Sequence, residues 1–276
     1  MKNFKNFAFD VDLTLIRRNG TVIDGAPEII TAIMKKSGTR LAIASGASLF
    51  EVNHAIDLIN AELPKDIKFD PTVIAFGGGY IKTPDKTIKN PIFNNELKEL
   101  ISIIREIDSK CVICYRTPEV NFYIDQNISD YLMAKLEHLP KNFGILDNLK
   151  DDDYLQSQMK NDNIYSLEII SETHHKEIFD HLTKVYTPKG YVVNFGTCVE
   201  INKLGKLNAL KSLFGDVKKV VYFGDGYNDI PCFKECGLSF GLGDKEDVVK
   251  YATYQSKDHY KALDVLFNQK EETLTL

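Results

Sequence analysis

Short apolar runs alternate with helical patterns at the beginning of the chain. After the first run, a segment opened by Pro27 and closed by Gly38 has apolar residues at helical spacing, and the segment ASLFEVNHAIDLI repeats that spacing after the second run. The three apolar runs read as strands: NFAFD at 6–10, LAIAS at 41–45 and VIAF at 73–76. This order of strand, helix, strand, helix, strand predicts an α/β fold with a doubly wound parallel sheet.

The pattern changes after residue 81. Strand-like pieces (CVICY, NFYI, IYSLEII and YVVNF) are separated there by helical and very polar stretches, which indicates an inserted α+β module. The earlier alternation returns with an expected strand at 199–201, a helix, and the strand KVVYF at 219–223. We therefore expect a split core domain, 1–81 and 191–276, interrupted by an inserted domain at 82–190.

Polar residues come directly after the expected core strands. Because ligands bind at the carboxyl ends of the strands in an open parallel sheet, these residues are the candidates for a site. Lys206 opens the helix ahead of the strand at 219–223. The other candidates follow the strands themselves: Asp10, Asp12 and Thr14 after the first, Ser45 and Gly46 after the second, and Asp225, Asn228 and Asp229 after the strand at 219–223.

The side chains of this set indicate a metal and a phosphoryl group. Its carboxylate and amide oxygens are the hard ligands that Mg²⁺ prefers, and no nearby cysteine or histidine constellation suggests zinc. Carboxylates around Mg²⁺, faced by the Ser45 hydroxyl and the Lys206 ammonium, suit phosphoryl transfer. Aspartate is a known nucleophile in such reactions and forms an aspartyl-phosphate.

Four motifs in this chain resemble those of the haloacid dehalogenase superfamily. Within it, the chain is similar to the Cof-type phosphatases, which carry a large cap inserted after the third core strand. The resemblance covers essentially the whole chain and implies a Rossmann-like core with an α+β cap. The motifs are DVDLT at 10–14, Ser45, Lys206 and GDGYND at 224–229, followed by a segment, GLSFGLGDKEDVVKYA, that resembles the family's A-M-G-N-A region.

The resemblance implies a role for each matching residue. Asp10 is expected to be the nucleophile and a Mg²⁺ ligand. Asp12 is expected to act as general acid and base and to give its backbone carbonyl to the metal. Asp225 is expected to bind Mg²⁺ directly. The remaining matches would hold the phosphoryl group (Ser45, Gly46 and Lys206) or complete and orient the metal surroundings (Thr14, Asn228 and Asp229), while the insertion closes over the site.

Two residues have alternative interpretations, and several depart from the family pattern. Lys203 competes with Lys206 for the phosphate-binding role because the spacing here differs from the usual one. Ser45 taken alone suits the N-cap of the helix that begins near Ser48. The departures bear on substrate preference more than on reaction type. This chain has Leu13 where the family commonly has glycine, Ala47 where it has arginine, Gly77 where it has asparagine, and Gly243–Asp244 where it has Gly-Asn.

Composition narrows the class of partner. The chain has 34 Lys and Arg against 39 Asp and Glu, a net charge of −5, which disfavours nucleic acid as a ligand. No apolar stretch approaches the roughly 20 residues of a membrane span. The amino terminus meets acidic residues before a signal-peptide core forms, so we expect a cytoplasmic protein. The five cysteines are few for a long chain and odd in number, so we expect them to be free thiols rather than parts of a disulfide framework.

Taken together, these features predict a Mg²⁺-dependent phosphatase that hydrolyses small phosphorylated metabolites through an aspartyl-phosphate. Sugar phosphates are the leading substrate class by resemblance. Two alternatives stay open: a phosphosugar mutase, which returns the phosphoryl group to the substrate, and a catalytically idle protein that only binds phosphate esters. The sequence does not indicate the oligomeric state.

Overall fold

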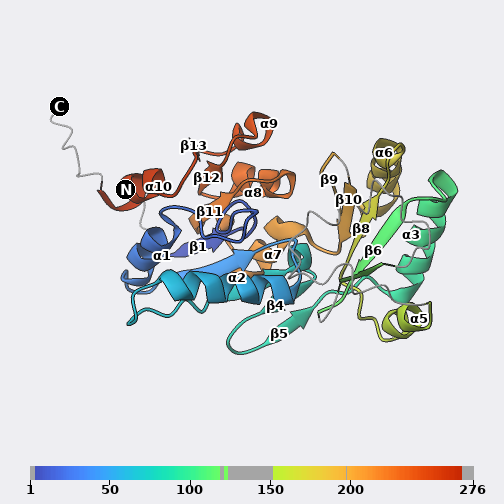
Figure 1. The fold of residues 1–276 in the computed structure, drawn as a ribbon, viewed down its shortest axis with the longest axis horizontal. Helices are drawn as coiled ribbons and strands as arrows, with labels where there is room; N and C mark the ends of the chain where they lie inside the picture. The colour runs from blue at the N-terminus through green and yellow to red at the C-terminus, as the bar shows by residue number, and fades with distance from the viewer. Residues whose placement is uncertain (1–3, 119–120, 124–151, 197, 269–276) are drawn as a thin grey trace. The chain divides into compact units, whose positions relative to one another are not determined.

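The computed structural model describes residues 4–118, 121–123, 152–196 and 198–268, which divide into two compact units (Figure 1). The first unit consists of Met1–Ile43, Asn53–Thr72 and Leu213–Leu276. The second consists of Ala44–Val52 and Val73–Ser212. The described strands form two sheets.

The first unit contains a parallel sheet with the strand order β13-β12-β11-β1-β2. All residues of its central strands β1 and β11 are buried. Near-continuous apolar strands of this kind are typical of parallel sheets that are covered on both faces. The strands are β1 (Asn6–Phe9), β2 (Arg40–Ala44), β11 (Val220–Gly224), β12 (Leu238–Leu242) and β13 (Tyr254–Ser256).

An aromatic row fixes the register of four of these strands. Phe9, Phe223, Phe240 and Tyr254 are paired in register across β1, β11, β12 and β13. Their rings stack with centroid distances of 4.3, 5.0 and 5.3 Å. Cross-strand aromatic pairs stabilise a sheet beyond their buried area, so this row holds the loops after β1 and β11 side by side.

Helices connect the parallel strands. α1 has a proline in its first turn, as the sequence predicts, and it lies beside α10, where a Cβ on Gly25 would come within 3.1 Å of the His259 Cβ. The helical elements are α1 (Ala26–Met34), α2 (Leu49–Glu62), η3 (Val217–Lys219), η4 (Tyr227–Asp229), α8 (Ile230–Glu235), α9 (Glu246–Val249), α10 (Tyr260–Leu263) and the π-helical η5 (Asp264–Asn268).

The second unit contains an antiparallel sheet with the order β7-β6-β8-β10-β9. Helices α3, α5 and α6 cover one of its faces with an apolar core, which includes Ile113, Leu167, Ile169 and Ile201 from the strands. The elements are α3 (Asn94–Ile107), β6 (Val112–Arg116), β7 (Asn121–Tyr123), α5 (Asp152–Lys160), β8 (Ser166–Ile170), α6 (His175–Tyr186), β9 (Tyr191–Asn194) and β10 (Cys198–Asn202).

The alternate residues of the same strands face away from these helices, and many of them are polar. They include Arg116, Ser166, Glu168, Glu200 and Asn202. The second unit also holds the short antiparallel set β3 (Thr72–Ala75), β4 (Tyr80–Lys82) and β5 (Thr87–Lys89), the turn η1 (Phe76–Gly78), and α7 (Gly205–Phe214).

The predicted fold class, an α/β core with a parallel sheet and an additional α+β module, is confirmed. One strand assignment was wrong: we expected 199–201 to return to the parallel sheet, but β10 pairs with β8 and β9. An apolar–polar–apolar pattern identifies a strand but not its partner. The domain boundaries at 82 and 190 stay a prediction, and residues 124–151 of the expected insertion lie outside the described residues.

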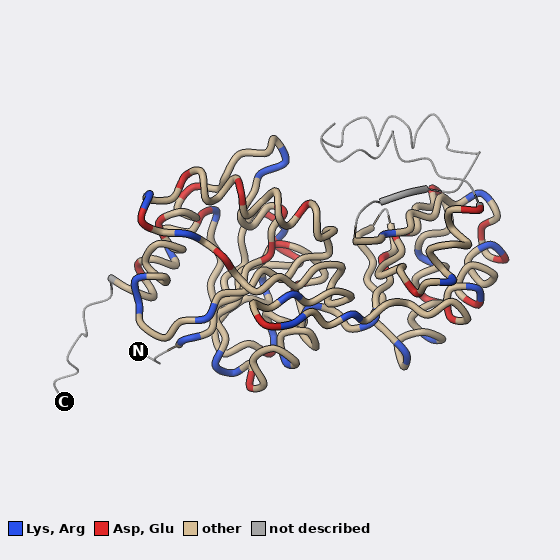
Figure 2. Tube along the Cα trace, turned by 90° about the horizontal axis from the view of Figure 1, so that it is seen from below, with Lys and Arg blue, Asp and Glu red and all other residues tan. Residues whose placement is uncertain are grey.

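The surface and cysteine features agree with an ordinary globular chain. Acidic and basic residues are interspersed along the trace in both units (Figure 2). None of the five cysteines, all of which lie in the described residues, forms a disulfide. Among the described residues, no helix has the length and apolar character needed to cross a membrane. A cytoplasmic location stays a prediction.

Candidate active site

The loop after β1 carries Asp10 and Asp12. Asp10 is 5% exposed, and its backbone N–H donates to the Phe223 carbonyl at 2.9 Å, which fixes it next to β11. The Val11 carbonyl accepts from three following backbone N–H groups, so the loop turns tightly. Leu13 has a φ of 56°, a left-handed conformation that favours glycine, and Asp12 is exposed on this turn.

The loop after β11 is held in shape by Asp229. One Asp229 oxygen accepts from the backbone N–H groups of Asp225 and Gly226 at 2.9 and 2.8 Å, and the other accepts from the Tyr222 hydroxyl at 2.5 Å. A Cβ on Gly224 would lie 2.5 Å from the Asp229 carboxyl carbon, so this close approach requires glycine. Burial and the neighbouring Asp229 raise the pKa of Tyr222 well above its usual value, which keeps it a donor.

Asp10, Asp225 and Asp229 form a carboxylate cluster. One oxygen from each lies within 4.8 Å of the others, and all three residues are buried. The register that places Phe9 opposite Phe223 brings the ends of β1 and β11 to the same edge of the sheet. Buried carboxylate oxygens gathered in this way are the hard donors that Mg²⁺ prefers, and magnesium sites complete their shell with water and substrate oxygens.

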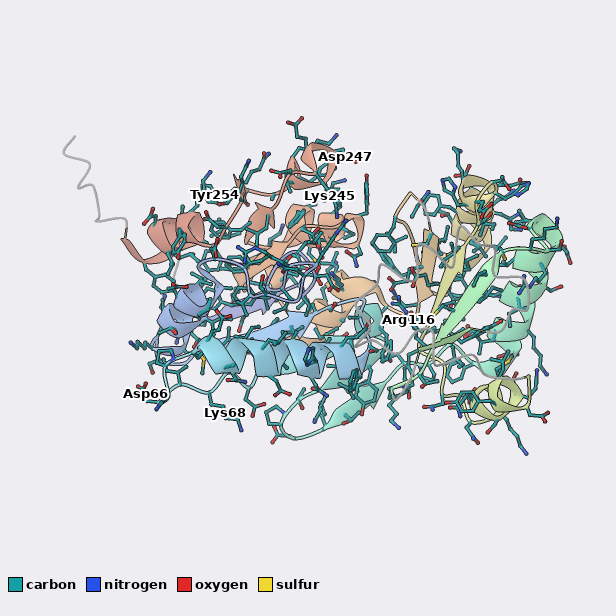
Figure 3. The ribbon with its side chains drawn as sticks, viewed as in Figure 1. Asp66, Lys68, Arg116, Lys245, Asp247 and Tyr254 are labelled. Carbon is teal, nitrogen blue, oxygen red and sulfur yellow. The ribbon has the colours of Figure 1, made fainter. Side chains whose placement is uncertain are left out.

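A lysine contacts this cluster. The Lys245 ammonium donates to Asp225 Oδ2 at 2.8 Å, and its side chain is 42% exposed whereas that of Asp225 is 8% exposed. Figure 3 labels Lys245 and Asp247 in the segment that begins α9. The Asp247 carboxylate accepts from the Tyr227 hydroxyl at 2.6 Å, which ties α9 to the loop after β11.

A buried histidine supports the loop that carries Asp10 and Asp12. His259 donates from Nε2 to the Thr14 carbonyl at 2.7 Å, and its ring lies against Phe9 and Phe223. Burial lowers the pKa of His259 to about 4, although the Thr14 bond and Asp258 act in the opposite direction. The Thr14 hydroxyl is buried and has no hydrogen-bond partner among the described residues.

Ser45 and Gly46 belong to the second unit. The Ser45 hydroxyl accepts from the Ala47 N–H at 3.1 Å, and its backbone N–H donates to the Ile74 carbonyl at 2.9 Å. Ser48, not Ser45, caps α2, because its hydroxyl accepts from the Glu51 N–H at 3.3 Å and its own N–H donates to the Glu51 side chain. The N-cap interpretation of Ser45 was therefore wrong.

The two candidate lysines have different surroundings. Lys206 is 1% exposed in the first turn of α7, whose Gly205 N–H donates to the Asn202 side chain at 2.8 Å. Lys203 forms an ion pair with Glu96 of α3 at 2.8 Å. The Lys203 ammonium is therefore engaged with α3.

A second polar group, the arginine network, lies on the polar face of the antiparallel sheet. Arg116, labelled in Figure 3, donates from Nη1 to the Gly46 carbonyl at 3.0 Å and from Nη2 to Glu168. Glu200 lies opposite Glu168 in register, is 5% exposed and accepts from Asn202 at 3.1 Å. These four residues, Arg116, Glu168, Glu200 and Asn202, are buried or largely buried.

The structure thus brings Asp10, Asp225 and Asp229 together, with Asp12 and Thr14 on the loop of Asp10 and Asn228 on the loop of Asp225. Ser45, Gly46 and Lys206 are positioned in the second unit. The roles of all these residues stay predictions.

Sequence reasoning missed Lys245, Arg116 and His259. Lys245 directly follows Gly243–Asp244, which departs from the family pattern, and this departure was the available signal. Arg116 is a charged residue at the end of an otherwise apolar strand. This position suggests a special role for Arg116, but the sequence does not show which residue it contacts. For His259 no local pattern distinguishes a buried ring from a surface one.

Comparison with known families decides the class of protein. The sequence model of the haloacid dehalogenase-like hydrolase family matches residues 7–263. The chain belongs to this family. The resemblance inferred from the motifs is therefore confirmed, and the chain is an enzyme of the haloacid dehalogenase (HAD) type.

Several relatives of this HAD chain have names that state an activity. The chain is 25% identical over 250 residues to 5-amino-6-(5-phospho-D-ribitylamino)uracil phosphatase YbjI of Escherichia coli, covering 84% of each protein. BT1666 of Bacteroides thetaiotaomicron, a phosphatase of the HAD superfamily, has a TM-score of 0.73 at 20% identity, covering 95% and 94% of the two chains. BT4131, a HAD subclass IIB sugar phosphatase, has a TM-score of 0.67 at 17% identity, covering 95% and 98%.

Proposed function

We propose that this chain is a Mg²⁺-dependent phosphatase that hydrolyses small phosphomonoesters through an aspartyl-phosphate on Asp10. The observation that carries the proposal is the carboxylate cluster at the ends of β1 and β11, which gathers Asp10, Asp225 and Asp229 within 4.8 Å. Membership of the HAD family supports the same reaction.

Asp10 is the proposed nucleophile, with Asp12 as its proton-transfer partner. An Asp10 oxygen bonds to phosphorus while the bond from phosphorus to the leaving oxygen breaks, and Asp12 gives that oxygen a proton. In the second half, Asp12 takes a proton from water, the water oxygen bonds to phosphorus, and the bond to Asp10 breaks. Exposure of Asp12 on its turn suits this role, because the residue exchanges protons with substrate and water.

Asp10, Asp225 and the Asp12 carbonyl are the proposed ligands of Mg²⁺. When bound, the metal neutralises phosphoryl oxygens and so lowers the barrier to attack by an anion. Asp229 is assigned an orienting role because both of its oxygens accept hydrogen bonds from its own loop and Tyr222. Thr14 and Asn228 are proposed to complete these surroundings.

Ser45, Gly46 and Lys206 are the proposed phosphate-binding groups. Lys206 is preferred because it matches the family motif and lies buried in the first turn of α7, whereas Lys203 pairs with Glu96 of α3. The inserted domain at 82–190 is proposed to act as a cap that excludes water and selects the leaving group.

Sugar or sugar-alcohol phosphates are the proposed substrates. The support comes from relatives: YbjI is named for a phosphoribityl compound, and BT4131 is described as a sugar phosphatase.

The test is phosphate release from a panel of sugar phosphates with Mg²⁺ present. We expect turnover by the wild-type chain and a loss of at least about 10³-fold in Asp10→Asn, because the nucleophile is removed. Asp66→Asn, at an exposed aspartate, is the matched control and should keep full activity. An inert wild type, or an active Asp10→Asn, contradicts the proposal.

Two other results would indicate a different function. A requirement for a sugar bisphosphate as activator indicates a phosphosugar mutase. Tight binding of phosphate esters without release of phosphate indicates the idle binding protein.

A further inference from the structure

The two side chains in the contact between Lys245 and Asp225 differ in exposure and flexibility. Asp225 is buried, and its backbone N–H is bound by Asp229. Lys245 is 42% exposed, and a lysine ammonium is a compact charge on a flexible four-carbon stem. The ammonium can therefore leave Asp225 for solvent without disturbing the buried core.

The backbone of Lys245 is nevertheless held in place. Its carbonyl accepts from the Val248 and Val249 N–H groups at 2.9 Å each, which starts the turn of α9. The bond between Tyr227 and Asp247 ties the same turn to the loop of Asp225. The stem of Lys245 thus begins at a fixed point beside the carboxylate cluster, so its ammonium stays at high local concentration there.

The ammonium contacts the Asp225 carboxylate, and a divalent cation held by the cluster would bind that same carboxylate. Three carboxylates within 4.8 Å repel one another, and either cation relieves that repulsion. Mg²⁺ binds oxygen at about 2.0–2.1 Å in a near-octahedral shell, which leaves no space for an ammonium hydrogen-bonded to the same oxygen along the same direction. Two cations at that distance also repel each other.

We propose that Lys245 sets the affinity of this enzyme for Mg²⁺ by competing with the metal for Asp225. The inference rests on the proposed function in assigning Mg²⁺ to the carboxylate cluster. In the metal-free protein Lys245 stabilises the cluster, and it withdraws into solvent when Mg²⁺ binds. The enzyme therefore responds to Mg²⁺ at higher concentrations than the three carboxylates alone would require.

The experiment is titration calorimetry of the full chain with MgCl₂ after removal of bound metal with EDTA. Lys245→Met should bind Mg²⁺ about fivefold or more tightly than wild type and should unfold at a lower temperature when metal is absent. Lys245→Arg keeps the charge and should bind no more tightly than wild type.

Lys257→Met is the matched control. Lys257 lies in the same part of the chain and forms an exposed ion pair with Asp244 at 3.5 Å. Its replacement by methionine removes one positive charge, as Lys245→Met does. It should bind Mg²⁺ within about twofold of wild type, because the Lys257 side chain is 85% exposed and pairs with Asp244, and such a charge is screened by solvent and salt.

The outcomes separate this inference from the proposed function. Unchanged or weaker binding by Lys245→Met overturns the inference, and so does equal tightening by Lys257→Met, which would show a long-range charge effect. A wild type that binds no Mg²⁺, or an Asp225→Asn that binds as well as wild type, overturns the metal site and the inference with it. Tighter binding by Lys245→Met in a chain that releases no phosphate from any ester supports the inference while contradicting the phosphatase.

Discussion

The carboxylate cluster and the arginine network are both groups of buried acids, but they differ in how their charge is compensated. In the cluster, three carboxylates lie within 4.8 Å, and Lys245, which contacts Asp225, has a side chain that is 42% exposed. In the network, Glu168 and Glu200 face each other across two strands, and Arg116 is only 16% exposed.

The surroundings of Arg116 keep its guanidinium charged, so it always compensates the charge of the neighbouring carboxylates. Burial by itself lowers the pKa of the guanidinium, but Glu168 and the other nearby acids raise it well above its usual value, so the group stays charged. Burial raises the pKa of Glu200, while Arg116 opposes that shift. The acid pair of the network keeps its counter-charge inside the fold, whereas an acid cluster with a partly exposed counter-charge is suited to receive a cation.

The strongest test of this comparison is removal of the guanidinium. Arg116→Met should lower the free energy of unfolding by about 3 kcal/mol, because it leaves buried carboxylates and the Gly46 carbonyl without their donor. Urea denaturation measures the effect, and Arg18→Met, at an exposed arginine, is the control. A loss below about 1 kcal/mol would mean that water compensates the network and that the contrast with the cluster is false.

The next test concerns His259, the neutral group beneath the loop of Asp10. Its folded pKa of about 4 lies below its ordinary value of 6.5, so the unfolded chain binds the proton more readily and acid destabilises the fold. The contribution of His259 is present above pH 6.5 and falls by about 2 kcal/mol between pH 7 and pH 5.

Denaturation of wild type and His259→Gln across that range checks this prediction. The glutamine keeps a donor for the Thr14 carbonyl but does not titrate, so the stability difference between the two proteins should shrink as the pH falls. A difference that stays constant would show that His259 is not buried in neutral form.

The smallest expected effect concerns the loop of Asp225. Tyr222→Phe removes a buried hydrogen bond to Asp229 and should cost about 1.5 kcal/mol of unfolding free energy, as is typical of bonds to charged groups. Tyr227→Phe removes an exposed bond to Asp247 and should cost less than about 0.5 kcal/mol. Equal costs in denaturation experiments would contradict the assignment of Asp229 as the residue that holds this loop.

The same comparison shows what sequence can predict. The strands that end at Asp10 and Asp225 were predicted because central parallel strands are continuous apolar runs followed by polar loops. The carboxylate cluster follows from that rule, since neighbouring parallel strands end at one edge of the sheet. The arginine network does not, because it depends on the register of β6, β8 and β10, which alternating patterns leave undetermined.

The sequence also did not predict the exact helix boundaries or the contacts of single long side chains. The helix expected from Asn228 to about Cys236 is a short turn, η4, followed by α8 from Ile230 to Glu235. Lys245 looks like any exposed lysine in its segment. Its contact with Asp225 spans 20 residues, and the bond between Tyr227 and Asp247 holds the same turn against that loop.

The most direct measurement of the central claim is chemical trapping of the phosphorylated enzyme. Wild-type protein is mixed with Mg²⁺ and a radiolabelled phosphomonoester that it hydrolyses, quenched in acid within milliseconds, and digested for mapping. The account predicts an acid-stable label, sensitive to hydroxylamine, on the peptide that contains Asp10, and no label in Asp10→Asn. Turnover without a labelled peptide, or a label on another residue, would contradict it.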